Sequence, residues 1–368
     1  MLKTLYLIYR LNIMKVTFLA FAILLIGMAH GQTQLWQTFI DTSVTFSSPR
    51  PVNLNGDATL DIIIGGGIDG APDARGVVAL DGLNGNVLWE FATDEEMFTS
   101  ASFGDANGDG QDDVFIGGRS GEFYAIDGQS GNMIWEFFPY PADQAADSGW
   151  LNFYSPQIIP DQNGDLVADI LVANGGDHAA FPWDTMRPPG RLMILDAVTG
   201  NIIAQDTMPD GEETYCSALC IDMANTGVYS IIFGSGGEDE GGSLWRVPLT
   251  DLMNNDISGA AMLIDDPITG FIAPSSIADI NYDGVYDIVS QSFSGSIHAI
   301  DGLMDTILWT VTIPGSQSSA APIFGNFTGN QSPDVFAVLG KGSAPSYFDY
   351  YQVMIDGNTG QIEFIDSI

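Results

Sequence analysis

The stretch Asp105-Ala-Asn-Gly-Asp-Gly-Gln-Asp-Asp113-Val-Phe-Ile-Gly117 decides how the chain folds. It carries oxygen-bearing side chains at its first, third, fifth and ninth positions, and an apolar run follows directly. Glycines at the fourth and sixth positions permit a sharp turn. The stretch therefore predicts a tight acidic loop that leads into a β-strand.

This acidic loop recurs along the chain. Three further intact copies begin at Asn53, Asp161 and Asp279, and two degenerate copies begin at Asp222 and Asn326. The fifth positions fall at 57, 109, 165, 226, 283 and 330, so the copies lie 52, 56, 61, 57 and 47 residues apart. A period of roughly 50 residues, built of short strands and glycine-rich turns, is typical of the blades of a β-propeller.

A second pattern follows each loop and completes the unit. It is a hydrophobic strand that ends in Asp-Gly-x-x-Gly and a further strand that carries Trp89, Trp135 or Trp309. In the fourth unit Pro248 replaces the aspartate. Each unit reads as four antiparallel strands, A to D, with strand A at small residues such as Ser47–Pro49. The recurring tryptophans indicate packing between blades.

We therefore expect an all-β fold, a β-propeller of four-stranded antiparallel blades with six recognisable units. Residues 35–42 read as a lone D-type strand before the first unit, and a D strand also ends the sixth. Seven D strands are one too many for six closed blades. We expect the propeller domain, residues 32–368, to be part of a seven- or eight-bladed ring that continues beyond Ile368.

The first 31 residues have the pattern of a signal peptide, with translation starting at Met1 or Met14. An apolar run from Val16 to Met28 precedes small residues, and cleavage is expected before Gln32. A membrane anchor is the alternative. Cleavage predicts a secreted, extracellular or cell-surface protein, with no membrane insertion of the mature chain.

Charge restricts the partners. The 368-residue chain has 47 acidic and 10 basic residues, and three of the basic ones, Lys3, Arg10 and Lys15, lie in the leader. So acidic a protein is not expected to bind nucleic acid or an anionic membrane. The two cysteines, Cys216 and Cys220, lie about 13 Å apart in an extended strand, beyond disulfide reach, and are expected to be buried free thiols.

The intact loops predict calcium sites. A hard divalent cation needs six or seven oxygen ligands, and alternate residues of a turning loop can all point inward. Oxygen-only ligands favour Ca²⁺ over zinc or copper. We expect about four Ca²⁺ ions, and the alternative is an Asp/Asn-rich turn without metal. The expected ligands are Asn53, Asn55, Asp57, Asp61, Asp105, Asn107, Asp109, Asp113, Asp161, Asn163, Asp165, Asp169, Asp279, Asn281, Asp283 and Asp287.

The loops, each followed by a strand and glycine, resemble the FG-GAP, integrin α-type, calcium-binding propeller repeats. The Asp-Gly-x-x-Gly element with its tryptophan resembles blades of PQQ-like quinoprotein propellers. Together these resemblances cover roughly residues 35–366. They imply a calcium-binding propeller, with metal ligands at the intact loops. The fourth and sixth units depart from the pattern and are not expected to bind an ion.

We expect a ligand-binding or adhesion module, with an extracellular glycan or a protein as its ligand. The alternative is a glycan-active or quinoprotein-like enzyme on the same scaffold. Two insertions in the third unit, residues 137–152 and 175–190, belong to the face opposite the acidic loops. There an aromatic-rich set predicts stacking on a ligand, while packing of these loops on one another is the alternative. The candidate ligand-binding residues are Tyr140, Trp150, His178, Phe181, Trp183 and Arg187.

Overall fold

The computed structural model of the chain describes residues 34–41, 43–137, 150–177, 180, 186–329 and 332–367. Two compact units are distinguished, Met1–Phe39 and Ile40–Ile368, and every strand lies in the second. The expected signal peptide, residues 1–31, falls within the first unit and lies outside the described residues. In the described part of the chain, no helix is long and apolar enough to cross a membrane.

Six antiparallel sheets form the second unit, and their strands follow the chain in order. The first three sheets comprise β1 (Arg50–Val52), β2 (Asp61–Gly65), β3 (Asp73–Leu80) and β4 (Val87–Thr93); β5 (Ser102–Gly104), β6 (Asp113–Gly117), β7 (Phe123–Ile126) and β8 (Met133–Glu136); and β9 (Asn152–Phe153), β10 (Gln157–Ile159), β11 (Asp169–Gly175), β12 (Arg191–Leu195) and β13 (Ile202–Thr207).

The last three sheets repeat the arrangement. They comprise β14 (Leu219–Ile221), β15 (Ser230–Gly234), β16 (Gly242–Pro248) and β17 (Ala261–Asp266); β18 (Ser276–Ala278), β19 (Asp287–Gln291), β20 (Ser296–Ile300) and β21 (Ile307–Thr312); and β22 (Ser316–Gln317), β23 (Ile323–Gly325), β24 (Asp334–Ser343), β25 (Ser346–Asp356) and β26 (Ile362–Ser367). The expected all-β fold of four-stranded antiparallel blades is confirmed, and we call these sheets blades 1 to 6.

The ninth residue of each acidic loop sets the register of its blade. Asp61 pairs with Val52 at the end of strand A, and Asp113 pairs with Gly104 in the same way. The third ladder of each blade, between strands C and D, contains an irregularity near the end of strand C, as between Ala79 and Leu80. The repeat in the sequence is therefore also a repeat in hydrogen-bonding geometry.

Strand A begins later than the sequence indicates. We expected it at Ser47–Pro49 and at the matching small residues, but β1 begins at Arg50. The small segments instead link neighbouring blades. The backbone N–H of Ser48 donates to the Ser100 hydroxyl, that of Ser100 to Ser155, and that of Ser155 to Ser217, at 3.2, 3.1 and 3.1 Å.

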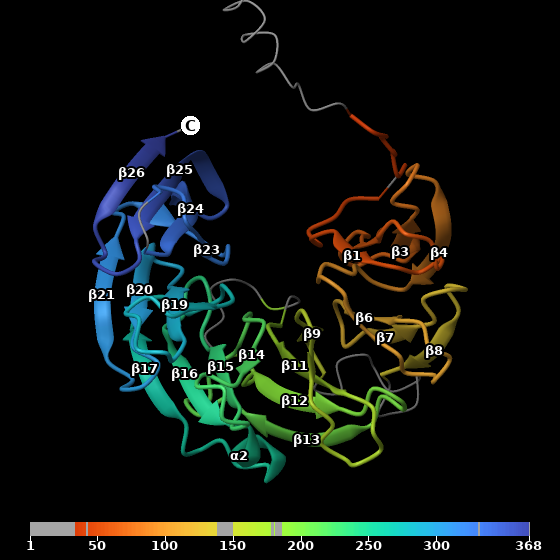
Figure 1. The fold of residues 1–368 in the computed structure, drawn as a ribbon, viewed down its shortest axis with the longest axis horizontal. Coiled ribbons are helices and arrows are strands. Elements are labelled where there is room, and N and C mark those ends of the chain that lie inside the picture. Colours follow the sequence, from red (N-terminus) through yellow and green to blue (C-terminus); the bar gives the residue numbers. More distant parts are fainter. Residues whose placement is uncertain are drawn as a thin grey trace, which may run out of the picture. The chain divides into compact units, whose positions relative to one another are not determined.

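Hydrophobic packing joins each blade to the next. Five clusters of buried side chains are present, and each draws on two blades that are consecutive in sequence. The recurring tryptophans lie in three of these clusters, and each indole N–H donates to a backbone carbonyl of the following blade: Trp89 to Gly128, Trp135 to Ala197 and Trp309 to Gly357. Packing between blades, as predicted, is their role. Figure 1 shows the blades in sequence order as an arc from blade 1 to blade 6.

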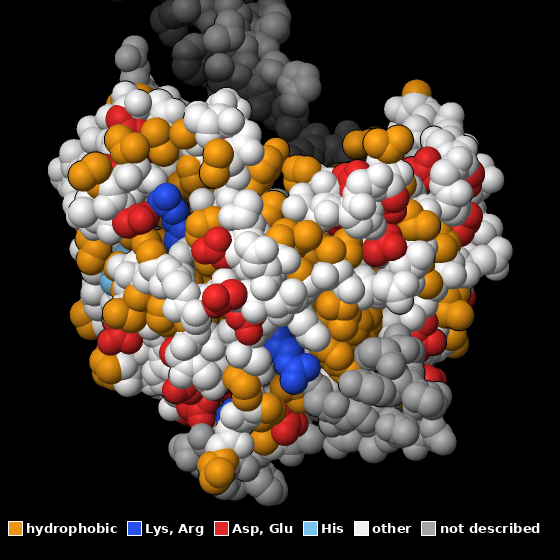
Figure 2. All heavy atoms as spheres, turned by 90° about the horizontal axis from the view of Figure 1, so that it is seen from below, with side chains coloured by type: hydrophobic (Ala, Val, Ile, Leu, Met, Phe, Trp, Pro, Cys, Tyr) orange, Lys and Arg blue, Asp and Glu red, His pale blue; other side chains and the backbone are white. Residues whose placement is uncertain are grey.

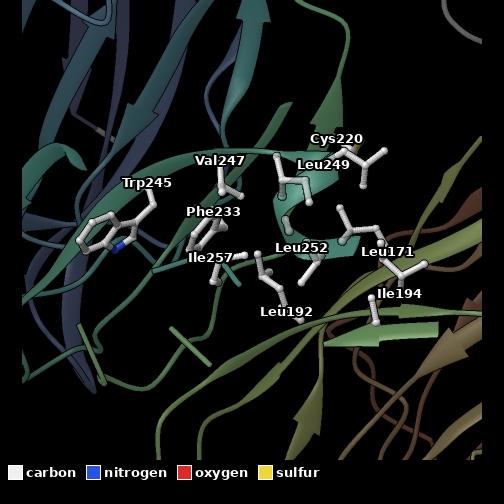
Figure 3. Packing of buried hydrophobic residues seen from close by; sticks show 14 of the residues in the cluster. Leu171, Leu192, Ile194, Cys220, Phe233, Trp245, Val247, Leu249, Leu252 and Ile257 are labelled. Atoms are coloured by element: carbon white, nitrogen blue, oxygen red, sulfur yellow. The ribbon is translucent and has the colours of Figure 1, made fainter. Parts of the chain in front are cut away.

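A short helix in blade 4 was not expected. α2 (Leu249–Met253) occupies the connection where Pro248 replaces the usual aspartate. Its buried side chains, Leu249 and Leu252, point toward Leu192 of blade 3 and Ile257 (Figure 3). The helix therefore fills the space between blades 3 and 4. Both cysteines are free and buried, as predicted, and Cys220 belongs to the same cluster.

Most of the acid on the surface has no basic partner to neutralise it. Figure 2 shows one face, on which acidic side chains are scattered among hydrophobic ones and basic side chains occupy a few separate spots. Among the described residues, ion pairs engage five of the basic side chains, namely Arg75, Arg119, Arg187, Arg246 and Lys341. The net charge of −37 is therefore spread widely, and most of the few basic side chains in the described part of the chain are engaged in ion pairs.

Candidate functional site

The acidic loops join strands A and B and are closed by their own side chains. In blade 2 the Asp105 carboxylate accepts backbone N–H groups from Gly108, Asp109 and Gly110 at 2.7, 3.1 and 2.9 Å. The Asn107 side-chain oxygen accepts from Asp109 at 2.9 Å. Backbone N–H groups of the turn therefore occupy the oxygens at the first and third positions.

The ninth carboxylate is buried and holds the loop against the next turn of its blade. Asp113 accepts the backbone N–H groups of Ala106 and Asn107 at 2.9 and 3.2 Å and that of Gly128 at 3.1 Å. The Asn107 side-chain N–H also faces this carboxylate, at 3.4 Å. Burial raises the pKa of Asp113, and these backbone donors oppose the rise. Blades 1 and 5 repeat the arrangement, so in these three blades hydrogen bonds already occupy the ninth carboxylate.

Blade 3 differs at this point. Ala197 stands where the other blades have the glycine donor, and one carboxylate oxygen of Asp169, Oδ1, is buried without a hydrogen-bond partner. The side-chain N–H of Asn163 turns to Asp165 at 3.3 Å rather than to Asp169. An orphaned buried carboxylate oxygen beside Asp161 and Asp165 fits a cation better than the hydrogen-bonded loops do.

Blade 6 brings together three carboxylates that sequence reasoning did not single out. Asp334, Asp356 and Glu363 have oxygens within 4.8 Å of one another. Among the described residues, this is the one group of three or more acid, histidine or cysteine side chains that is so close. Glu363 stands on β26, at a position where other blades have aliphatic residues. The repeat pattern did not predict this set, because the recognisable feature of strand D is its tryptophan and not an acid.

A cavity of about 200 Å³ opens on the face opposite the acidic loops. The lining segments are connections between strands B and C or between D and A, in blades 3 and 4, together with the start of blade 5. In an up-and-down blade these connections share one face, and the acidic loops lie on the other. The lining residues are Asp177, Ala180, Arg187, Glu213, Tyr215, Glu238, Asp239, Glu240 and Ile272.

Glu213 is a buried acid in the wall of this cavity. Its side chain is 3% exposed, and the backbone carbonyls of Glu212 and Glu213 accept N–H groups from Gly190 and Gly236, which tie the segment to both flanking loops. A Cβ atom on Gly237 would lie 2.7 Å from the Glu213 carboxylate, so a larger residue there would displace this carboxylate. Burial raises the pKa of Glu213 to about 7, although the nearby Arg187 opposes the rise.

Arg187 is held inside the cavity by several acceptors. Its Nη1 lies 3.4 Å from the Glu213 carboxylate and 3.3 Å from the Tyr215 hydroxyl, and it donates to the backbone carbonyl of Asp177 at 2.9 Å. The Arg187 side chain is 9% exposed. The protein's own acceptors, a carboxylate, a hydroxyl and a backbone carbonyl, therefore engage this guanidinium.

Glu240 is the residue whose bonding is incomplete. Both oxygens of its carboxylate are buried, and neither has a hydrogen-bond partner. It belongs to the run Gly-Gly-Glu-Asp-Glu-Gly-Gly at residues 236–242, between β15 and β16. Three successive acids between glycine pairs are the signal by which the sequence could have shown this part of the site.

Of the six residues predicted to bind a ligand, only Arg187 lines the cavity among those described. Trp150 is 8% exposed, its ring meets Phe137 edge-on at 5.2 Å, and Arg191 lies over it at 5.0 Å. The packing alternative therefore describes Trp150 better than stacking on a ligand does. The remaining four, Tyr140, His178, Phe181 and Trp183, lie outside the described residues.

Comparison with solved structures shows the same fold in proteins of different kinds. The quinohemoprotein alcohol dehydrogenase ADHIIG of Pseudomonas putida HK5 matches with a TM-score of 0.59 and 13% identity over 91% of this chain and 62% of its own. A europium-containing methanol dehydrogenase matches with a TM-score of 0.54 and 11% identity, over 89% and 73%. BBS1N, from a complex with ARL6DN, matches with a TM-score of 0.52 and 11% identity, over 86% of this chain and 80% of its own. At such low identity these likenesses show the fold and not a function.

Comparison with protein families is more specific. None of the curated proteins matches the chain. The model of the FAM234A/B β-propeller matches residues 72–261, which is more than half of the sequence. The matched region runs from the start of β3 to the start of β17 and therefore includes the blades that build most of the cavity. The chain belongs to the FAM234A/B β-propeller family.

Proposed function

We propose that this protein is a ligand-binding propeller and that its ligand occupies the cavity at Glu213 and Glu240. The cavity carries the proposal. Loops of three consecutive blades build it, charged side chains are buried in its wall, and it lies on the face away from the acidic loops. Concave sites with a few convergent polar groups are the usual form of a binding site.

The expected setting of this binding is extracellular. The signal-peptide pattern of residues 1–31 and the abundance of acid support a secreted or cell-surface protein, in which the propeller acts as an adhesion module. A protein or a glycan is the ligand class in this proposal. The buried Trp150 and the charged wall of the cavity favour a protein over stacking on a sugar.

Calcium belongs to the proposal as a stabilising ion on the opposite face, in the manner of the FG-GAP repeats. The loops of blades 1, 2, 3 and 5 offer carboxylate and amide oxygens in each turn. Blade 3 gives the best fit, because Asp169 has a buried oxygen without a partner. In blades 1, 2 and 5 the third-position amide would have to turn its oxygen toward the ion.

The test is a screen of the protein on glycan and peptide arrays, in calcium and in chelator, with a variant that fills the cavity. Ala180→Trp places a large ring in the cavity, and Ala224→Trp places the same ring on an exposed loop of the opposite face. We expect array signals to disappear with Ala180→Trp and to persist with Ala224→Trp, at an unchanged melting temperature. Full binding by the cavity-filled variant would place the ligand elsewhere.

A further inference from the structure

The geometry points to an organic cation as the group that this cavity recognises: the ammonium or guanidinium end of a basic side chain on a protein ligand. This inference rests on the proposed binding function and adds the chemistry of the ligand. It depends on three observations, which are the balance of charge in the cavity, the unpaired carboxylate of Glu240, and the spacing of the acids.

The charge balance is strongly negative. Five carboxylates line the cavity, from Asp177, Glu213, Glu238, Asp239 and Glu240, against the single guanidinium of Arg187. That guanidinium is committed to Glu213 and Tyr215. Glu240, in the loop between β15 and β16, interacts with that guanidinium through charge but accepts no hydrogen bond from the described residues. Clustered carboxylates around a low-dielectric hollow attract a positive group.

The Glu240 carboxylate needs a donor. A buried carboxylate without hydrogen bonds is costly, and proteins avoid this cost by pairing the group or by placing it where a ligand will pair with it. No described side chain donates to either oxygen of Glu240, although both are buried. A ligand nitrogen with several N–H groups would satisfy both oxygens and balance the charge at once.

The spacing of the acids separates an organic cation from a metal ion. A calcium ion would need several oxygens converging at about 2.3–2.6 Å. The cavity acids do not converge in this way, since in the described part of the chain the close threefold set is that of blade 6; the acids of a single acidic loop do not either, but there amide and backbone oxygens of the turn could complete a site. Arg187 would also repel a divalent ion more strongly than a singly charged group, because the Coulomb energy grows with charge. Ammonium and guanidinium groups carry donors that reach separated acceptors.

The rest of the wall suits the stem of a basic side chain. Ala180, Ile272 and the Tyr215 ring supply apolar surface beside the acids. Lysine and arginine bury their aliphatic stems along such surface while the charged end reaches polar groups. Tyr215 is itself fixed by an edge-on contact with Tyr154 at 6.2 Å between ring centres. The cavity thus has an apolar side and an acidic side.

The experiment is a calorimetric titration of the full chain with Nα-acetyl-lysine amide, Nα-acetyl-arginine amide and the uncharged Nα-acetyl-norleucine amide. Cadaverine serves as a free diamine, and calcium chloride as the metal. We expect the two basic amides to bind at least ten times more tightly than norleucine amide. Glu240→Gln should weaken both at least tenfold and leave the melting temperature unchanged or raised. Glu90→Gln removes a carboxylate of blade 1 that pairs with Arg75 outside the cavity; it is the control and should leave both affinities unchanged.

The outcomes distinguish this inference from the proposed function. Equal binding of norleucine and lysine amides, or an unchanged affinity in Glu240→Gln, would overturn the selection of cations. The proposed binding function would survive this result if the array signals still depend on Ala180. Competition by calcium chloride for the same site would assign the cavity to a metal instead. Cadaverine binding more tightly than either amide would identify a free diamine rather than a protein side chain as the source of the cation, which overturns the protein-ligand part.

Discussion

Single carboxylates in this protein are buried in two different surroundings. Asp113 accepts three backbone N–H groups at 2.9–3.2 Å, and these favour its charged form against the effect of burial. Glu122 is 8% exposed and accepts the backbone N–H groups of Asp94 and Glu95 at 3.2 and 3.3 Å, and it also makes a side-chain hydrogen bond with Tyr124. Burial raises the pKa of Glu122 to about 7, and the negative charge of Asp94 adds to the rise.

Because of this raised pKa, Glu122 should make the free energy of unfolding fall as the pH rises. Its folded-state pKa lies above the ordinary value of 4.5, so its contribution is fully present below pH 4.5 and is lost as the pH rises through 7. Tyr124 and Glu136 share its surroundings, and burial raises the pKa of both. We expect Glu122→Gln to gain stability over the wild type between pH 5 and 8, by up to about 3 kcal/mol. Denaturant unfolding at several pH values measures this, and parallel curves would exclude it.

Among the elements, the strands that repeat were predictable and those that depart from the repeat were not. Asp61 and Asp113 begin strand B as the sequence indicates, because the acidic loop and the β-branched run recur with it. Strand A is displaced because its small residues make bonds between blades, a tertiary contact that local propensity does not reveal. α2 spans five residues, too few for helical periodicity to be visible.

The packing of α2 can be tested directly. Leu252 is fully buried and contributes to the cluster between blades 3 and 4 (Figure 3). Truncation to alanine removes buried methyl groups and leaves a cavity, so Leu252→Ala should lower the free energy of unfolding by about 3 kcal/mol. Leu303→Ala removes the same atoms from a 61% exposed position and should cost far less. Equal losses in the two variants would show that α2 does not support the interface.

At the scale of the whole molecule, the sequence placed the blade 3 insertions on the face where the cavity lies, but it did not indicate the composition of the cavity. Arg187 was identifiable because basic residues are scarce and it lies in an insertion. Glu213 and Glu240 were not, because the chain has 47 acids and periodicity cannot show which of them converge from different blades. Sites assembled by neighbouring repeats depend on inter-blade geometry, which a single sequence does not display.

Because the chain is so acidic, a test of the calcium proposal needs a control for the screening of charge repulsion that any salt produces. Any salt reduces repulsion within a chain of net charge −37, so added calcium chloride should raise the melting temperature partly for that reason. We expect millimolar calcium chloride to raise the melting temperature more than sodium chloride of equal ionic strength does. Each site with a dissociation constant of about 10⁻⁵–10⁻⁴ M would add about 1.4–2.7 kcal/mol.

A matched pair of substitutions assigns that calcium increment to a loop. Asp161 in blade 3 and Asp222 in the degenerate loop of blade 4 both accept backbone N–H groups of their turns, so replacing either by asparagine disturbs the turn alike. Only the blade 3 loop has the ligand pattern and an orphaned carboxylate oxygen. We therefore expect Asp161→Asn to lose part of the calcium-dependent increment and Asp222→Asn to keep all of it. Melting curves in chelator and in calcium measure both, and identical increments in the two variants would remove blade 3 from the proposed sites.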